Sequence, residues 1–441
     1  KSAAIAWKLA IAAVVLSSSF ACGGAAQKSP PASVVVTNRA TAAHVSFVET
    51  LPGRDPQLLW DDRGNLHLLT VQEIAGKKKI VYRRLGNEPA GPFDVSPTDF
   101  EVTAHGETPP AFEILRDGTL LAAYPVALPG KWKGELRVQR STDRGATWGA
   151  PRLLHPQRHG AHSFLSSAAL PRGGAAFAWL DDSGGRQGLR FATTREGQEI
   201  TPPTTLDPKS CECCATTLFA SERGLSLVYR DVSDDELRDF FVLFDPSALG
   251  EFGRASAVSQ DGWKIAGCPH TGARMVETQS GARWAAWFTG AEPAGIYAAR
   301  SLDGEHFEPR ELVVSFEPNP VRHPELGELP NGRLVVLYET TRDDGASTLE
   351  FRERDPTTGV WSAAHTLALA GKYPRFARRA VRSLNPNDDP SAVAFTCVAG
   401  ESTRIAVATW DQIALGTATW PDCDDRQERQ KGDEHSSPHS E

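Results

Sequence analysis

Short apolar runs separated by glycine-containing turns follow one another along most of the chain. The recurring unit is a short extended segment, a turn, and an apolar strand that often ends on an aromatic residue, as in DPQLLWDDRGNLHLL and TPPAFEILRDGTLLAAY. Short apolar runs that are bounded by turn residues are typical of β-strands. The repeating region contains no convincing long helical pattern. The pattern therefore predicts an all-β fold.

The unit recurs with a period of roughly 53 residues, within the range of propeller blades. Its seven copies begin near Asp55, Thr108, His162, Cys213, Cys268, Arg322 and Tyr373. Two more strand-like runs follow each hairpin, which predicts a β-propeller of seven four-stranded blades. Six blades are the alternative, because the last copy is the weakest. The N-terminal run HVSFVETL is expected to supply the last outer strand and close the ring, so that no sheet edge is left exposed.

The N-terminal segment has the features of a secretory signal: two early lysines, an apolar run, and small residues before Cys22. It also resembles a bacterial lipoprotein cleavage site, which makes Cys22 the expected lipidation site; free secretion is the alternative. Either route exports the protein, as a periplasmic or outer-membrane lipoprotein or as a secreted protein. The expected divisions are a signal peptide at 1–22, a flexible tether at 23–40, a propeller at 41–423 and a disordered charged tail at 424–441.

The formal net charge is −8 and no basic stripe is visible, which argues against a nucleic-acid partner. We expect a monomer whose contact with a membrane is limited to the lipid anchor. In a propeller the first strand of every blade lines a central channel, and the loops entering those strands share one face. One channel mouth is therefore expected to bring together Arg54, Asp55, His105, Glu107, His159, His162, Cys211, Cys213, Cys214, Cys268, His270, Arg322, His323, Tyr373 and Arg375.

Three cysteines lie within the segment KSCECCATTLF, and a fourth opens the next repeat. One interpretation is disulfide bonds between blades four and five, because disulfides persist outside the cytoplasm. The other is a soft-metal site for copper or zinc, since thiolates and imidazoles bind both metals. The candidate ligands are Cys211, Cys213, Cys214, Cys268, His270 and His162. Cys397 and Cys423 fit a separate disulfide in the last blade, and no other cofactor is expected.

Two further segments carry candidate binding residues. VYRDVSDDELRDFF alternates charges, and Arg230 within it would grip a carboxylate with two parallel hydrogen bonds. QDGWKIAGCPH offers Trp263 as an aromatic platform. The alternatives are an ordinary exposed charged loop and a tryptophan that packs in the core.

The segment STDRGATW (Ser141–Trp148) matches the Asp-box, S-x-D-x-G-x-T-W, and SLDGEHF (Ser301–Phe307) is a degraded copy in the same place. The motif stabilises a peripheral turn, in which Asp143 accepts backbone N–H bonds and Gly145 takes a positive φ. The Asp-box and the blade pattern resemble the sialidase (BNR-repeat) superfamily. More specifically, the chain resembles a set of bacterial exported exo-alpha-sialidase-like propellers, on the motifs CECCATTL, VYRDVSDDELRDF, DGWKIAGCPHTG, AAWFTG and YPRFAR.

This resemblance implies a glycoside hydrolase of exo-alpha-sialidase type whose partner is an acidic glycan or glycoprotein. Sialidases hold the substrate carboxylate with three arginines, for which Arg54, Arg322 and Arg375 are the candidates, and Asp55 and Arg230 are further substrate-binding candidates. A Tyr–Glu pair forms the nucleophile, here assigned to Tyr373 with Glu325, and Glu328 is the alternative partner. The family's acid aspartate has no counterpart in TVQEIAGKKK. The alternatives are a non-catalytic, surface-tethered propeller that binds glycan or protein, and a Cys/His metal-binding propeller.

Overall fold

The computed structural model describes residues 47–409 except for 87, 131–132, 157–159, 196–198, 268, 330, 343–344 and 380–391. The predictions for Cys22, the signal peptide, the tether, Cys268, Cys423 and the charged tail lie outside these residues. Every regular element of the described part is a β-strand, which confirms the all-β prediction. None of its residues form a helix able to cross a membrane.

The strands form seven sheets, one for each predicted blade, with four antiparallel strands as the basic unit. Blade 1 contains β2 (Arg54–Trp60), β3 (Leu66–Ile74), β4 (Lys77–Leu85) and β5 (Ala90–Asp94). Blade 2 contains β6 (Ala111–Ile114), β7 (Leu120–Ala127), β8 (Gly134–Ser141) and β9 (Arg152–Leu153). Blade 3 contains β10 (His162–Ala169), β11 (Ala175–Asp181), β12 (Gly188–Arg195), β13 (Glu199–Ile200) and β14 (Thr204–Asp207). Blade 4 contains β15 (Thr217–Ser221), β16 (Gly224–Arg230), β17 (Phe240–Asp245) and β18 (Ser256–Ala257).

The remaining three blades complete the ring in chain order. Blade 5 contains β19 (Arg274–Glu277), β20 (Arg283–Thr289), β21 (Gly295–Ser301) and β22 (Glu311–Ser315). Blade 6 contains β23 (Val321–Glu328), β24 (Leu334–Thr341), β25 (Ser347–Arg354) and β26 (His365–Ala370). Blade 7 contains β27 (Lys372–Phe376), β29 (Ala392–Ala399), β30 (Ser402–Thr409) and β1 (Phe47–Pro52), while β28 (Arg378–Arg379) pairs in parallel with β2.

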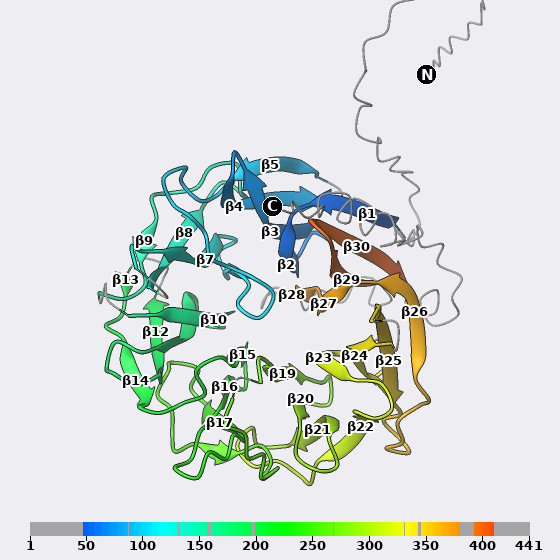
Figure 1. Ribbon diagram of the computed structural model, residues 1–441. Helices are drawn as coiled ribbons and strands as arrows, with labels where there is room; N and C mark the ends of the chain where they lie inside the picture. The colour runs from blue at the N-terminus through cyan, green and yellow to red at the C-terminus, as the bar shows by residue number, and fades with distance from the viewer. Residues whose placement is uncertain are drawn as a thin grey trace, which may run out of the picture. The chain divides into compact units, whose positions relative to one another are not determined.

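Closure of the ring follows from two sets of contacts (Figure 1). The innermost strands touch their neighbours in the order β2, β6, β10, β15, β19, β23, β27 and back to β2. The N-terminal β1 pairs with β30, so one blade is built from both ends of the fold. The prediction of seven blades closed by an N-terminal strand is confirmed, and the six-blade alternative is wrong.

The hydrophobic core consists of seven clusters, and each fills the interface between two adjacent blades. The middle strands are covered by a neighbouring blade on both faces, which explains their continuous apolar runs. Residues Ala175–Asp181 of β11, for example, are all buried. Burial of these runs stabilises the ring and leaves the entry loops of the innermost strands free for function.

Four innermost strands share a β-bulge at their entry. Asp55, Phe164, His323 and Tyr373 occupy the bulges, each with a φ between 50° and 54°. A positive φ is costly for residues with a Cβ, and such strain is found where the surrounding structure requires it. Proline follows in three of the four cases and fits because it has no N–H to donate to the ladder. The repeat thus places an unusual backbone conformation at the same end of several blades.

The Asp-box forms the peripheral turn between β8 and β9. Asp143 accepts hydrogen bonds from Ser141 Oγ at 2.8 Å and from the Thr147 backbone N–H at 2.9 Å. The Gly145 N–H donates to Ser141 Oγ at 2.8 Å, and Gly145 has a φ of 89°. Trp148 packs against Tyr82 of blade 1, with ring centroids 5.8 Å apart. The motif stabilises the peripheral turn, as predicted, and Trp148 in addition joins blade 2 to blade 1.

Candidate functional site

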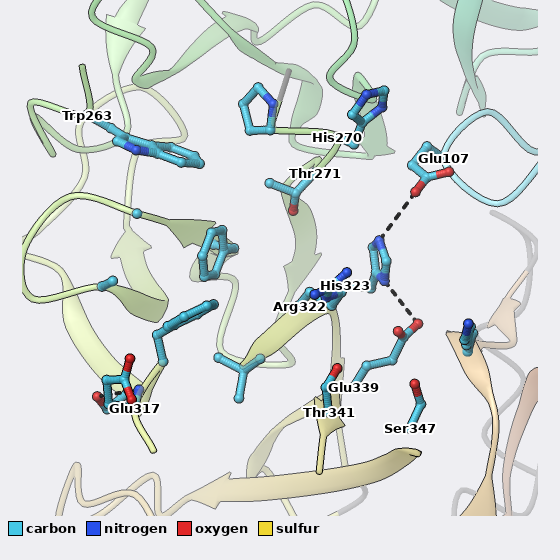
Figure 2. Close-up of a pocket in the computed structure, with 18 of the residues that line it drawn as sticks. Glu107, Trp263, His270, Thr271, Glu317, Arg322, His323, Glu339, Thr341 and Ser347 are labelled. Atoms are coloured by element: carbon cyan, nitrogen blue, oxygen red, sulfur yellow. Dashed lines mark hydrogen bonds and ion pairs between the residues drawn. The ribbon is translucent and has the colours of Figure 1, made fainter. Parts of the chain in front are cut away.

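A cavity of about 870 Å³ opens beside the innermost strands of blades 5, 6 and 7. One wall is aromatic and consists of Trp263, Phe288 and Phe316. The opposite wall is polar and contains Glu107, Tyr373, His323 and Glu339, with the exposed cations Arg322 and Lys372 beside them. Figure 2 shows Trp263 on one side of this space and the Glu107–His323–Glu339 row on the other. An apolar face opposite charged groups suits a ligand such as an acidic sugar.

The polar wall is one hydrogen-bonded network drawn from blades 2, 6 and 7. Tyr373 Oη donates to Glu107 Oε1 at 3.1 Å. The ring of His323 lies 3.0 Å from Glu339 Oε1 through Nδ1 and 3.7 Å from Glu107 Oε1 through Nε2 (Figure 2). The Tyr373 backbone N–H also donates to Glu339. The expectation that distant segments meet at one channel mouth therefore holds for Glu107, His323 and Tyr373, and Glu339 joins them from the second strand of blade 6.

The loop that carries Glu107 can approach Tyr373 because its neighbour is a glycine. A Cβ placed on Gly106 would lie 2.1 Å from Cζ of Tyr373, far inside any permitted contact. His105 and Thr108 close the loop through a two-residue bridge. Any larger residue at position 106 would therefore push the carboxylate of Glu107 away from the tyrosine.

The network shifts the pKa values of its members in different directions. Burial would raise the pKa of Glu107, but hydrogen bonds from His105, His323 and Tyr373 outweigh it and lower that pKa well below its ordinary value. Burial, followed by the charge of Glu107, raises the pKa of Tyr373. Burial would lower the pKa of His323, yet its hydrogen bonds with Glu107 and Glu339 raise it. At neutral pH Glu107 is accordingly a carboxylate, and the phenol of Tyr373 is protonated.

A second carboxyl group at the mouth behaves in the opposite way. Asp55 is 6% exposed, and burial raises its pKa in spite of the charges of Arg54 and His105. Among the described residues, Asp55 Oδ1 has no hydrogen-bond partner. Its charge also acts on Tyr373 and Arg375, so it lies near them, although it is not one of the residues that line the cavity. Two carboxyls with pKa values shifted apart can serve as acid and base.

The predicted arginine triad does not converge in one place. Arg54 pairs with Glu401 at 3.0 Å on an exposed edge, whereas Arg322 lines the cavity. Arg375 lies deeper in the channel, where it donates to Gly106 O at 3.3 Å and lies 3.7 Å from Glu325. Burial, together with the charge of nearby Arg274, lowers the pKa of Arg375 to about 10.

Glu325, the predicted partner of Tyr373, has another role. Its Oε2 accepts a hydrogen bond from Arg274 Nε at 2.8 Å, and it is buried between Arg274 and Arg375 beside a small channel cavity of about 120 Å³. The carboxylate on Tyr373 is Glu107. Glu325 therefore faces two half-buried arginines, and the carboxylate next to Tyr373 comes from a different blade.

Arg230 supports the aromatic wall from behind. It is 1% exposed, and it donates to Arg238 O at 2.6 Å and Phe288 O at 3.0 Å. Its guanidinium lies over the rings of Phe240 and Trp263, at 4.0 and 4.9 Å from their centroids. Trp263 lines the cavity, as predicted for a platform, while Arg230 is covered by its own neighbours and positions that platform.

The cysteine cluster does not line the cavity and lies at the interface of blades 3 and 4. Cys211, Cys213 and Cys214 are buried, and their sulfur atoms lie within 4.8 Å of one another. Cys211 Sγ and Cys214 Sγ are 2.8 Å apart as thiols. Neither predicted histidine joins them in the described structure: His270 lines the cavity, and His162 contacts Gly134 O at 2.8 Å and Asp181 at 3.2 Å. His162 is thus a buried structural residue, stacked on His155.

Glu107 and His323 were expected at the channel mouth, at the entries of their repeats, but without a chemical role. Glu339 was not predicted. It lies in the second strand of blade 6, in LVVLYETT, where it is the first of three polar residues after an apolar run. Its only signal is that a buried position, 3% exposed in the structure, carries a charge.

No known family model and no curated protein matches this sequence. Solved structures match at the level of the fold. An ulvan lyase of polysaccharide lyase family PL25 is 12% identical, with 86% of this chain and 100% of that chain covered and a TM-score of 0.54. The α-L-arabinanase of Penicillium chrysogenum is 14% identical over 72% and 97% of the two chains, with a TM-score of 0.47. A Hadza microbial sialidase is 13% identical over 81% and 75%, with a TM-score of 0.43. At 12% identity, the likeness to the ulvan lyase shows a shared fold and nothing about function.

Proposed function

We propose that the protein is an exported glycoside hydrolase of exo-alpha-sialidase type that acts on acidic glycans or glycoproteins at the channel mouth. The observation that carries the proposal is the hydrogen bond from Tyr373 Oη to Glu107 Oε1, at 3.1 Å. A tyrosine beside a carboxylate is the nucleophile pair implied by the sialidase resemblance, and this pair borders a cavity large enough for a sugar.

The shifted pKa values assign a role to each group. Tyr373 is protonated at neutral pH and needs a base, which the ionised Glu107 provides as Oη bonds to the anomeric carbon. Asp55, whose pKa is raised, gives its proton to the glycosidic oxygen as the C–O bond breaks. Water, deprotonated by Asp55, then cleaves the glycosyl–tyrosine bond, and Glu107 returns the proton to Tyr373.

The remaining walls explain why the substrate would be acidic. Arg322 and Lys372 are exposed cations of the polar wall, and a guanidinium can bind a carboxylate with two hydrogen bonds. The aromatic wall offers the face of Trp263 to a sugar ring. The ulvan lyase with the same fold was solved bound to -[GlcA(1-4)Rha3S]-, a glycan that carries acidic groups. A propeller of this type is therefore compatible with such ligands.

The direct test is a panel of fluorogenic aryl glycosides that differ in charge. We expect release of the fluorophore from a sialoside or a glucuronide and none from a neutral arabinofuranoside. Release from the neutral glycoside alone would contradict the charge argument. Saturable binding of a glycoside without release of product would indicate a binding propeller instead of a hydrolase. Formation of an unsaturated uronate from a uronate polysaccharide, seen by its ultraviolet absorbance, would indicate a lyase instead.

A further inference from the structure

The cysteine cluster of blade 4 offers only sulfur atoms as possible metal ligands. Cys211, Cys213 and Cys214 are 1%, 5% and 2% exposed, and their three Sγ atoms lie within 4.8 Å of one another. In the described residues no imidazole or carboxylate completes this group. Thiolates alone select soft metal ions, whereas Ca²⁺ and Mg²⁺ require oxygen ligands. Structural Zn²⁺ sites almost always have four protein ligands, one more than the sulfurs here.

A buried cation beside the sulfurs is the independent sign of a site for thiolates. Arg238 is 5% exposed, and its Nη1 lies 3.5 Å from Cys211 Sγ. Its Nε donates to Ile265 O at 3.0 Å, which fixes the guanidinium, while Nη2 pairs with Glu236 at 3.0 Å. Glu212 also lies 3.8 Å from Nη1, so the guanidinium has two carboxylate partners, and an ionised Cys211 sulfur would be a third anionic neighbour.

The loop that carries the cysteines reaches the surface close to the sulfurs, because Glu212, between two of the cysteines, is exposed.

We propose that Cys211, Cys213 and Cys214 bind one Cu(I) ion through their three sulfur atoms. Three Cu–S bonds form, the three S–H protons pass to the solvent, and copper keeps its oxidation state. The ion would carry a net charge of −2 with its ligands, next to Arg238 and close to Arg230. This site does not rest on the proposed glycosidase activity, because it lies at the interface of blades 3 and 4 and the cavity lies beside blades 5 to 7.

The test is an anaerobic titration of the reduced full chain with Cu(I) against the chromophoric chelator bicinchoninate. We expect the wild-type chain to retain one Cu(I) in competition with the chelator. The affinity for Cu(I) should fall at least tenfold in Cys211→Ser and Cys214→Ser. Cys397→Ser is the matched control, because it removes a buried thiol at the interface of blades 6 and 7 and should retain the ion. Arg238→Gln should weaken binding about tenfold without changing the stoichiometry.

Two results would overturn the proposal. In the first, the wild-type chain yields all its copper to the chelator, as the cysteine variants do. In the second, Zn(II) is retained with one ion per chain and Cu(I) is not. Thermal unfolding of each variant shows whether it is folded, and the wild-type titration is decisive even if a variant is not.

Discussion

The Asp-box turn of blade 2 and the channel mouth both rest on carboxylates, yet they are assembled in different ways. In the Asp-box, Asp143 binds groups that are at most four positions away in sequence. At the mouth, Glu107 and Tyr373 are 266 positions apart. The first is a local motif that stabilises a turn, and the second exists only because the ring closes. A local motif therefore marks the fold here, while the residues proposed for chemistry meet only through the closed ring.

The largest expected effect is a loss of activity when the channel mouth is changed. Glu107→Gln removes the base that accepts the proton of Tyr373 while keeping the size of the side chain. General-base catalysis contributes about 10²–10⁴-fold, so kcat on an acidic aryl glycoside should fall by about that factor. Steady-state kinetics measures the loss. Tyr338→Phe, which removes a buried hydroxyl of blade 6 away from the cavity wall, should keep its activity. Equal losses in both variants would point to general damage of the fold.

The next effect compares two arginines that the sequence treats alike. Arg322→Ala should raise KM for the acidic substrate about tenfold or more, because a charge-assisted hydrogen bond contributes about 1.5–3 kcal/mol. Arg54→Ala should change KM little, since Arg54 is on an exposed edge and pairs with Glu401. Kinetics of both variants with acidic and neutral glycosides measures the difference. A rise in KM for Arg54→Ala alone would indicate that the substrate carboxylate binds at Arg54, as the sialidase resemblance implies.

A smaller effect concerns stability and belongs to the Asp-box. Asp143→Ala removes the acceptor for Ser141 Oγ and the Thr147 N–H, and should lower the free energy of unfolding by about 1 kcal/mol. Asp303→Ala in the degraded box should act similarly, because Asp303 accepts the N–H groups of Glu305 and His306 at 2.9 and 2.8 Å. Denaturant melts measure both, and kcat/KM should not change. Lost turnover in a fully folded variant would mean that the box has a catalytic role.

The smallest effect is a pH dependence at the polar wall. The pKa of His323 is raised from its ordinary 6.5, so its contribution to stability is present below about pH 6.5 and disappears as pH rises through the raised pKa. The pKa of Glu107 is lowered, so its contribution is present above about pH 4.5 and disappears as pH falls through the lowered pKa. The difference in unfolding free energy between wild type and His323→Gln should therefore shrink towards alkaline pH. A difference that grows instead would contradict the ion pairs of His323.

The sequence was enough to predict most of the fold, because the fold depends on repeated local patterns. The period of the repeats predicts seven blades, and the strand-like run HVSFVETL predicts the strand that pairs with β30. The Asp-box follows from its own residues. Each of these features depends on hydrogen bonds and apolar faces that recur in every blade.

The partners at the mouth were harder to predict, because the bulges break the regular alternation of side chains. At a bulge, position along the strand no longer tells which side chain enters the channel. Glu325, past the bulge of β23, thus faces Arg274 and Arg375, while His323 in the bulge contacts Glu107. The buried position of Arg230 depends on a carbonyl of blade 5, Phe288 O, which no local pattern of blade 4 reveals.

Covalent trapping on Tyr373 tests the central claim most directly. A fluorinated acidic glycosyl donor with a good leaving group slows hydrolysis of the glycosyl–enzyme, so the intermediate accumulates for mass spectrometry of the intact chain and its peptides. We predict one glycosyl group per chain, located on the peptide that contains Tyr373 and absent in Tyr373→Phe. Turnover of the acidic glycoside without any adduct, or an adduct on another residue, would contradict the account.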